Sequence, residues 1–269
     1  HTRSLCDWSS DVCSSDLKAS RIRSLLEQRL GLFERQLAAA SLVLVPSRTH
    51  LVRMGDLVPL EGKARILEPG LCQEFPGLAP SPPAFDGKDA LRILHHGRRS
   101  EAKGTLDLVR ALAELPAGTV ELVALGGAED GLDDRLRAAA PELPMELGGV
   151  YGATALEEAA ARCHLAALPS RLPESYSLAV DEALALGLPV WACSADAARA
   201  RHGADVVREL PAREPSAWMR ALLEVLGQPA RLEAQRATVP QDVPLAGAQA
   251  ARLAQLLELA DPRTGRRAS

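Results

Sequence analysis

The sequence predicts an α/β protein built on a doubly wound parallel sheet. Two observations carry this prediction. Short apolar runs alternate with helical patterns of about ten residues, which is typical of βαβ units and of parallel sheets covered on both faces. The composition, with 47% hydrophobic and 25% charged residues, is that of a globular protein, and 269 residues can bury a sizeable core. We expect one or two domains.

The first seventeen residues are excluded from the fold prediction as non-native and disordered. Residues 7–17 match the translation of a common sequencing adapter over eleven consecutive positions. The alternative is a small segment closed by a disulfide between Cys6 and Cys13. On the adapter interpretation the native sequence begins near Lys18 and is truncated upstream, so its start and any targeting signal lie outside this chain.

The first 57 residues after the adapter read as the remnant of an amino-terminal domain, 18–74. Apolar residues at helical spacing predict an amphipathic helix over 18–40. The remaining elements are a strand at 42–45, a helix at 48–56 and a strand at 64–68. The proline-rich stretch 75–87 then reads as a linker, and we place a domain boundary there.

Residues 88–260 are expected to form the complete domain, followed by a disordered tail, 261–269. The predicted strands are 91–95, 120–125, 145–147, 164–168, 190–193 and 206–209. The predicted helices are 105–115, 132–139, 155–162, 178–186, 197–202, 216–226 and 248–260. This alternation is what predicts the parallel sheet.

Net charge, hydropathy and cysteine usage exclude several classes. The net charge of −4 gives no electrostatic reason to expect nucleic-acid binding. We find no apolar run of about 18 residues, so we expect no membrane span and a cytoplasmic protein, with peripheral association at the inner membrane left open. Cys72, Cys163 and Cys193 are expected to be buried thiols without metal-binding spacing. The abundance of Ala, Leu and Arg is typical of a GC-rich bacterial genome.

The stretch 169–190 reads as a loop, a short helix and the start of the next strand. Pro169 and Pro173 bracket a segment that cannot be helix interior. Gly187 stands where a helix ends in a left-handed residue, and Pro189 follows it. The loop therefore lies at the carboxyl end of a strand, where open parallel sheets bind ligands.

Two carboxylates, Glu174 and Glu182, flank the start of this helix eight residues apart. On one continuous helix they would be about 12 Å apart. Hydrolytic carboxylate pairs need separations of about 5–9.5 Å. We therefore interpret them as two separate ligand contacts. The alternatives are a loop-capping residue for Glu174 and a solvated helix face for Glu182.

A second loop, 97–104, follows the strand at 91–95 and opens a helix. Its glycines allow a tight turn, and the helix amino end offers free N–H groups. Arg98 and Lys103 add two cations, which together would make a diphosphate site without a metal. The loop taken alone fits a solvated basic loop better.

Several other residues invite a role. His95 and His96 end a strand, could approach a phosphate or base, and are expected to be structural, as is His164. The pair at 126–127 is expected to shape a strand-to-helix turn rather than to contact a ligand. Trp191 and Trp218 are expected to pack in the core.

These motifs resemble a known family. Glu174 and Glu182, within Pro169-Ser170-Arg171, Glu182-Ala183-Leu184-Ala185 and Gly187-Leu188-Pro189-Val190, resemble the signature of retaining glycosyltransferases of the GT-B fold, family 4, the glycosyltransferase group 1 type. The loop 97–104, the segment 38–47 and the segment 66–75 resemble further family elements in the right order. The resemblance covers about 20–260 and implies a Rossmann-like donor domain.

The resemblance implies roles for individual residues. Arg98 and Lys103 would bind the diphosphate of a nucleotide sugar and stabilise the leaving nucleotide, and Glu174 would hydrogen-bond the sugar hydroxyls. The remaining implied donor-binding residues are Gly97 in the loop, Val150 and Tyr151 at the base, Ser177 and Leu178 through backbone amides, and Glu182 at the ribose. Family chemistry is transfer with retention, by front-side attack, with neither metal nor cofactor.

The chain departs from the family pattern at two places. Ser41 replaces an Asp, and Tyr176-Ser177 replaces Phe-Gly, so the phosphate turn carries a side chain where glycine is common. The domain that holds the glycan or lipid-linked acceptor is mostly missing, so we expect weak donor binding and no transfer. The alternatives are a sugar-nucleotide-binding module without transfer activity and a sugar-nucleotide epimerase of the same fold.

Overall fold

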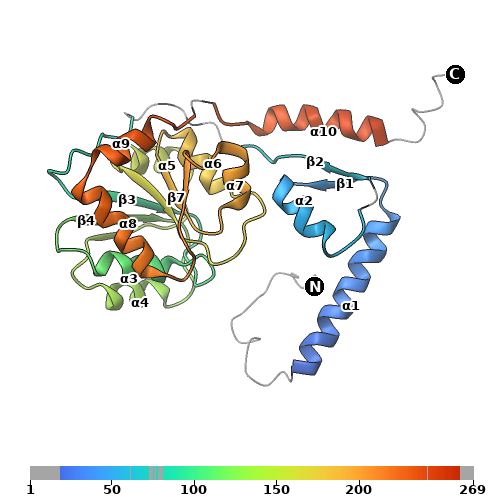
Figure 1. The fold of residues 1–269 in the computed structure, drawn as a ribbon, viewed down its shortest axis with the longest axis horizontal. Helices are drawn as coiled ribbons and strands as arrows, with labels where there is room; N and C mark the ends of the chain where they lie inside the picture. Colours follow the sequence, from blue (N-terminus) through green and yellow to red (C-terminus); the bar gives the residue numbers. More distant parts are fainter. Residues whose placement is uncertain are drawn as a thin grey trace.

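The protein is described here by a computed structural model that covers residues 19–60, 62–72, 75, 77, 81–240 and 242–260. The predictions for residues 1–17, including the Cys6–Cys13 alternative, and for the tail 261–269 lie outside these residues. Within them the chain forms a six-stranded sheet with helices on both faces, and a smaller part with two strands (Figure 1).

The large sheet is parallel and has the strand order β5-β4-β3-β6-β7-β8. The predicted α/β fold with a doubly wound sheet is confirmed. The order reverses between β3 and β6, and ligands bind at such reversal points in open α/β sheets. The strands are β3 (Leu91–His96), β4 (Val120–Leu125), β5 (Met145–Leu147), β6 (Leu165–Leu168), β7 (Val190–Ala192) and β8 (Val207–Glu209).

Side chains alternate between two cores, one on each face of this sheet. Ile93 points to a core shared with α3 (Thr105–Ala113), α4 (Leu132–Ala139), α8 (Pro215–Gly227) and α9 (Ala230–Arg236). The next residue, Leu94, points to a core shared with α5 (Ala153–Ala160), α6 (Leu178–Ala185) and α7 (Asp196–His202). Both cores must form for the carboxyl ends of β3 and β6 to meet.

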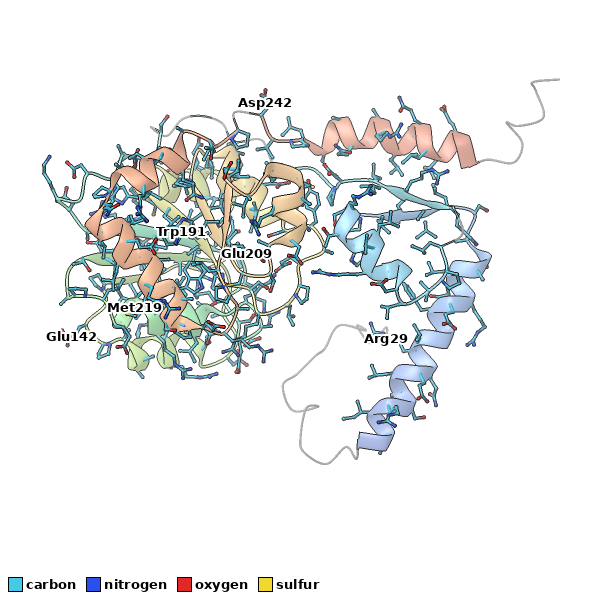
Figure 2. All side chains as sticks on the ribbon, viewed as in Figure 1. Arg29, Glu142, Trp191, Glu209, Met219 and Asp242 are labelled. Atoms are coloured by element: carbon cyan, nitrogen blue, oxygen red, sulfur yellow. The ribbon has the colours of Figure 1, made fainter. Side chains whose placement is uncertain are left out.

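The two tryptophans lie in the core, as predicted. Trp191 and Trp218 are almost fully buried, with ring centroids 6.4 Å apart, and Trp191 lies within the large domain in Figure 2. The Trp191 Nε1 donates a hydrogen bond of 2.8 Å to Gln235 on α9. The sequence did not predict α9, because this seven-residue helix buries a single leucine, Leu232.

The smaller part holds α1 (Ala19–Ala39), β1 (Val43–Val45), α2 (Arg48–Gly55) and β2 (Ala64–Ile66), with β1 and β2 paired in parallel. Its core is small and centred on Val43, Val45, Val58 and Leu60. The predicted amphipathic helix is formed, and Leu37 packs on this core. Its other large apolar side chains, from Ile22 to Phe33, are exposed in the described residues.

The predicted linker has neither helix nor strand at its described residues. Its end is nevertheless docked, since Phe85 is buried in a core and its backbone N–H donates to Glu233 on α9. The domain boundaries stay a prediction. The last helix, α10 (Ala246–Ala260), extends away from the large sheet (Figure 1), and Leu71 pairs with Leu245 at its start.

One prediction about the cysteines is wrong. Cys163 and Cys193 are buried, but Cys72 is exposed, because it lies in an irregular segment after β2 outside the cores. Among the described residues, no helix is long and apolar enough to cross a membrane.

Candidate functional site

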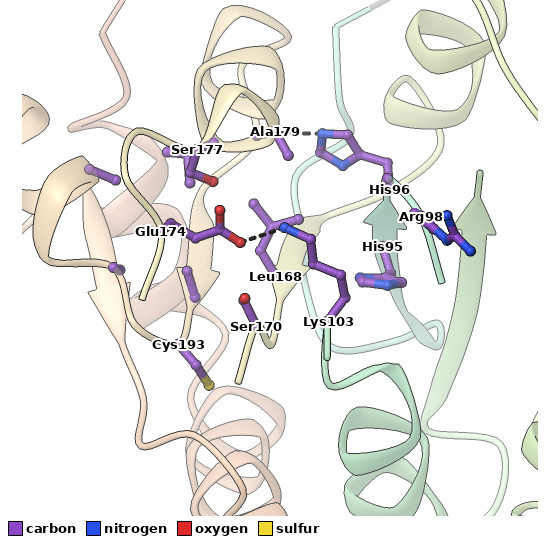
Figure 3. A pocket seen from close by; sticks show the side chains of 15 residues that line it. His95, His96, Arg98, Lys103, Leu168, Ser170, Glu174, Ser177, Ala179 and Cys193 are labelled. Carbon is purple, nitrogen blue, oxygen red and sulfur yellow. Dashed lines mark hydrogen bonds and ion pairs between the residues drawn. The ribbon is translucent and has the colours of Figure 1, made fainter. Parts of the chain in front are cut away.

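A pocket lies at the carboxyl ends of β3 and β6, at the reversal point of the sheet (Figure 3). Five of the residues predicted from the sequence line it: Gly97, Arg98, Lys103, Glu174 and Ser177. Two loops and the start of α6 bring them together, because parallel strands end at the same edge. The structure therefore brings these five residues together, whereas Val150, Tyr151, Leu178 and Glu182 do not line the pocket; the roles of all nine stay a prediction.

Lys103 and Glu174 face each other across this pocket. The Lys103 Nζ lies 2.5 Å from the Glu174 Oε1, and both side chains keep some exposure to solvent. Such a partly exposed ion pair contributes little to stability, about 0–1 kcal/mol. Its value is chemical, since an ammonium that binds anions stands beside a carboxylate that accepts hydrogen bonds from hydroxyls.

The two adjacent arginines of the first loop behave differently. Arg98 is exposed, and in Figure 3 its guanidinium points away from the Lys103–Glu174 pair. Arg99 is buried and pairs with Asp133 through two bonds of 2.9 and 2.8 Å. Its Nη1 also donates to the carbonyl of Ala124 within β4 and to the carbonyls of Gly126 and Gly148, which follow β4 and β5. Sequence analysis missed Arg99, and only its place beside Arg98 could have pointed to it.

Two close approaches of backbone set the shape of the pocket wall. A Cβ added at Gly126 would lie 2.0 Å from the Gly97 carbonyl oxygen. A Cβ added at Gly104 would lie 2.0 Å from the Pro169 carbonyl oxygen. Gly126 is therefore sterically required at its turn, whereas nothing lies within 4 Å of a Cβ added at Gly127, and Gly104 brings the two loops of the pocket together.

His95 is structural, as predicted. Its Nδ1 donates 2.9 Å to the Ala167 carbonyl, and its Nε2 lies 3.1 Å from the Thr105 hydroxyl. Burial lowers the pKa of His95 to about 4, so the ring is neutral at pH 7. It fixes the end of β3 against β6 and α3. His164 is also structural, because its Nδ1 accepts from the Arg92 N–H at 2.9 Å.

His96 lies on the other side of the strand, against α6. Its Nε2 donates 3.0 Å to the Ala179 carbonyl and is 3.4 Å from the Glu182 Oε2. The ring of Tyr151 meets it edge-on, with centroids 6.3 Å apart. Burial raises the pKa of the Tyr151 hydroxyl, and the charge of Glu182 raises it further. Glu182, His96 and Tyr151 therefore form one group at the border of the pocket.

Comparison with known proteins identifies the family. The family of glycosyl transferases group 1 matches residues 90–228, which is more than half of the chain. The chain belongs to this family. The match covers β3 to α8 and includes all the pocket loops, and no match was found among curated protein sequences.

Solved structures show the fold of this chain. Sucrose-phosphate synthase from Thermosynechococcus elongatus aligns with a TM-score of 0.69 and 21% identity, over 87% of this chain and 61% of that one. HepE from Anabaena, in complex with UDP and glucose, aligns at 0.68 and 20%, over 88% and 67%. WaaG, a glycosyltransferase involved in lipopolysaccharide biosynthesis, aligns at 0.59 and 14%, over 81% and 62%. The predicted GT-B fold is confirmed, and the chain spans about two thirds of its relatives' length or less.

Three further predicted donor-binding residues lie at the surface or at the start of α6. Val150 is 93% exposed and Leu178 is 42% exposed. Ser177 precedes α6 with a φ of 72° and a ψ of 81°, the left-handed backbone that glycine favours. At this departure from the family pattern, serine therefore adopts the left-handed backbone that glycine favours.

The residues that the structure describes contain no group of three or more His, Cys, Asp or Glu side chains placed to hold a metal ion. Metal-independent chemistry stays a prediction for this glycosyltransferase.

Proposed function

We propose that this chain is mainly the donor-binding half of a glycosyltransferase: it binds a nucleotide-diphosphate sugar in this pocket, and the whole enzyme transfers the sugar, with retention, to a glycan or lipid-linked acceptor. The observation that carries the proposal is the Lys103–Glu174 pair, 2.5 Å apart, at the reversal point of the sheet and beside the Ser177 turn. Family membership and the structure of HepE with UDP and glucose support it.

The diphosphate is assigned to the cationic side of the pocket. Lys103 exchanges its bond to Glu174 for a phosphate oxygen, and the exposed Arg98 turns inward to a second. As the bond to the sugar breaks, negative charge develops on the leaving diphosphate, and these two cations stabilise it there. That is the charge a metal ion would otherwise supply, so the proposed reaction is metal-independent.

The sugar and the nucleoside are assigned to the two carboxylates. Released from Lys103, Glu174 accepts hydrogen bonds from sugar hydroxyls. Glu182, near His96, accepts from the ribose hydroxyls. Val150 and Tyr151 contact the base, and the amides of Ser177 and Leu178 at the start of α6 bind phosphate. Gly97 allows the close approach of the backbone.

Retention requires same-face attack, because neither carboxylate is assigned as a nucleophile that would form a covalent intermediate. In the proposed step the acceptor oxygen bonds to the anomeric carbon from the face that the nucleotide leaves, the bond from that carbon to the diphosphate breaks, and the acceptor's proton passes to the leaving phosphate oxygen. WaaG, named for its part in lipopolysaccharide biosynthesis, supports a glycan or lipid-linked acceptor.

Calorimetric titration of the chain with UDP-, GDP- and ADP-sugars tests donor binding. We expect the chain to prefer the donor with one of the three bases. Lys103→Ala should lower the affinity for that donor about tenfold, since a charge-assisted hydrogen bond contributes about 1.5–3 kcal/mol. Glu158→Ala, which removes an exposed carboxylate on α5, is the matched control and leaves affinity unchanged. The absence of binding by every donor would overturn the proposal.

The two carboxylates are separated by comparing donor with nucleotide. Glu182→Ala weakens both UDP and UDP-sugar if UDP is the preferred nucleotide, because the ribose is common to both. Glu174→Ala weakens only the sugar nucleotide. Equal losses from both variants for both ligands would contradict the assignment.

A second candidate is donor binding without transfer. It is favoured by the pocket itself, because each pocket residue assigned above contacts the donor and none is assigned to an acceptor. Nucleotide release in the presence of acceptor glycans decides between the two, since a binding module releases none.

A further inference from the structure

A buried ionic group lies behind the start of α6, outside the pocket. Asp181, on α6, has no solvent exposure. Its Oδ1 accepts 2.7 Å from the Arg201 Nη2 and 2.8 Å from the His202 Nε2, both on α7. A buried carboxylate needs such partners, because an unpaired charge in the interior is strongly unfavourable.

Arg201 also holds the backbone before the helix. Its Nη1 donates 2.8 Å to the carbonyl oxygen of Tyr176. Its guanidinium carbon lies 3.6 Å from the centroid of the Tyr176 ring, a cation–π arrangement. One side chain, itself oriented by Asp181, therefore fixes both the carbonyl and the ring of the residue that precedes Ser177.

The next residue has a conformation that serine does not favour. Ser177 has a φ of 72°, and its side chain makes no capping hydrogen bond to the helix. The left-handed region is unfavourable for residues other than glycine, so contacts elsewhere must maintain it. The Arg201 bond to Tyr176 is one such contact. The hydroxyl of Ser47, which donates 2.6 Å to the carbonyl of Ser175, is another.

We propose that Asp181 and Arg201 are positioning residues for the donor: they hold Tyr176 so that Ser177 keeps its left-handed conformation and the first amides of α6 face the pocket. This inference rests on the proposed function, because the ligand for those amides is the phosphate of the nucleotide sugar. Ser177 and Ala179 line the pocket, which places the turn beside that ligand. Asp181 and Arg201 do not line the pocket, so they act on the ligand only through the backbone of the turn.

The charge state of the group suits this role. Burial acts to raise the pKa of Asp181, but the hydrogen bonds from His202 and Arg201 and the charge of Arg201 outweigh it and hold the pKa below its usual range. The carboxylate therefore stays ionised at neutral pH and keeps Arg201 in place.

The test combines Arg201→Gln with Ser177→Gly. Arg201→Gln removes the bond to Tyr176, and we expect affinity for UDP-glucose to fall about tenfold. Ser177→Gly keeps the backbone amide and serves as the reference background, in which Arg201→Gln should cost much less than tenfold, since glycine adopts the same backbone freely. The double variant recovers most of the lost affinity, because glycine keeps the left-handed backbone without the contacts of Arg201 to Tyr176. Arg199→Gln is the matched control on α7: it removes a pair with Glu209 that does not touch the turn.

Two outcomes would overturn the inference. One is an Arg201→Gln variant that binds UDP-glucose as the wild type does. The other is a double variant with no recovery, which would mean that Arg201 acts by general stability alone. If Arg201→Gln does not fold, Arg201→Lys keeps the charge and the pair with Asp181 but loses the second donor, and Ser177→Gly must rescue it in the same way.

Amide hydrogen exchange separates this inference from the proposed function. In Arg201→Gln, amide exchange at Val180, whose N–H donates to the Ser177 carbonyl oxygen, should rise well above that in Arg199→Gln, with no ligand present. A wild type that binds none of the tested UDP-, GDP- or ADP-sugars would overturn the proposed function. Unchanged amide exchange in Arg201→Gln would overturn the positioning role of Asp181 and Arg201.

Discussion

The two flanks of the pocket are each held by a buried arginine. Arg99, with a side chain 3% exposed, pairs with Asp133 and donates to backbone carbonyls after β4 and β5. Arg201, 9% exposed, pairs with Asp181 and donates to the carbonyl of Tyr176 before α6. On both flanks a guanidinium with fixed donors orients loops that lie outside the six strands.

The flanks differ in how the turn before the helix is specified. Gly104 precedes α3 with a φ of 70°, and Ser177 precedes α6 with a φ of 72°. At the first turn glycine itself permits the conformation and the close approach to Pro169. At the turn before α6, contacts from Arg201 and Ser47, which are distant in sequence, maintain the left-handed conformation instead. One turn is therefore specified locally and the other by tertiary structure.

The largest effect is expected where glycine is sterically required. Gly104→Ala combines a left-handed backbone, about 1–2 kcal/mol, with overpacking, about 1–3 kcal/mol. We expect a loss of about 4 kcal/mol and a melting temperature lower by about 8–16 °C in a thermal scan. Gly118→Ala is the control, since its φ of 76° is similar but nothing lies within 4 Å of the added Cβ. Equal losses for the two variants would mean that the approach to Pro169 is not tight.

The second prediction concerns the anchor of the same flank. Arg99→Met leaves the carbonyls of Gly126 and Gly148 without their donor and removes the partner of Asp133, which can still be hydrated. We expect a loss of about 2–3 kcal/mol in urea unfolding. Arg98→Met, one residue away and exposed, should stay within about 0.5 kcal/mol of the wild type. Similar losses for both variants would contradict the different roles assigned to these arginines.

The third prediction concerns His95, which joins β3 to both flanks. Its pKa is lowered by burial from 6.5 to about 4, so the native state holds the neutral ring. As pH falls below 6.5, His95 is protonated in the unfolded chain but stays neutral in the native state. The free energy of unfolding therefore decreases with falling pH, down to about pH 4.

Urea unfolding at pH 7 and pH 5 measures this effect. Between these values the wild type should lose about 2 kcal/mol more than His95→Gln, which cannot titrate. His164, whose pKa burial also lowers, is present in both proteins and cancels from the comparison. Parallel losses in the two proteins would show that His95 is not buried as a neutral ring.

Most of the fold was predictable from periodicity. Strands and helices from β3 to α8 lie within a few residues of their predicted ranges, because each buries an apolar face whose spacing is visible in the chain. The exception, α9, is seven residues long and has one buried leucine, which is too little pattern to detect. The exposure of Cys72 could not be seen either, because burial in an irregular segment depends on neighbours distant in sequence.

The candidate site was predictable only as a place and a set of loops. The motifs pointed to Arg98 and Glu182. The charged side chains that the structure buries are their neighbours in sequence, Arg99 and Asp181. Which of two neighbouring charges turns inward depends on partners elsewhere: carbonyls after β4 and β5 for Arg99, and α7 for Asp181. Local spacing carries no information about those partners.

The smallest expected effect tests whether the second flank depends on the amino-terminal part. The Ser47 hydroxyl caps α2 by accepting from the His50 N–H at 3.1 Å and also donates to the Ser175 carbonyl. Ser47→Ala loses both bonds, and we expect a loss of about 1–2 kcal/mol. Ser47→Gly also loses both bonds, but glycine at this position costs only a few tenths of a kcal/mol in helix capping. The loss that Ser47→Gly retains therefore measures the bond to Ser175. A Ser47→Gly variant with wild-type stability and wild-type amide exchange at 175–177 would leave Arg201 as the contact that maintains the left-handed turn.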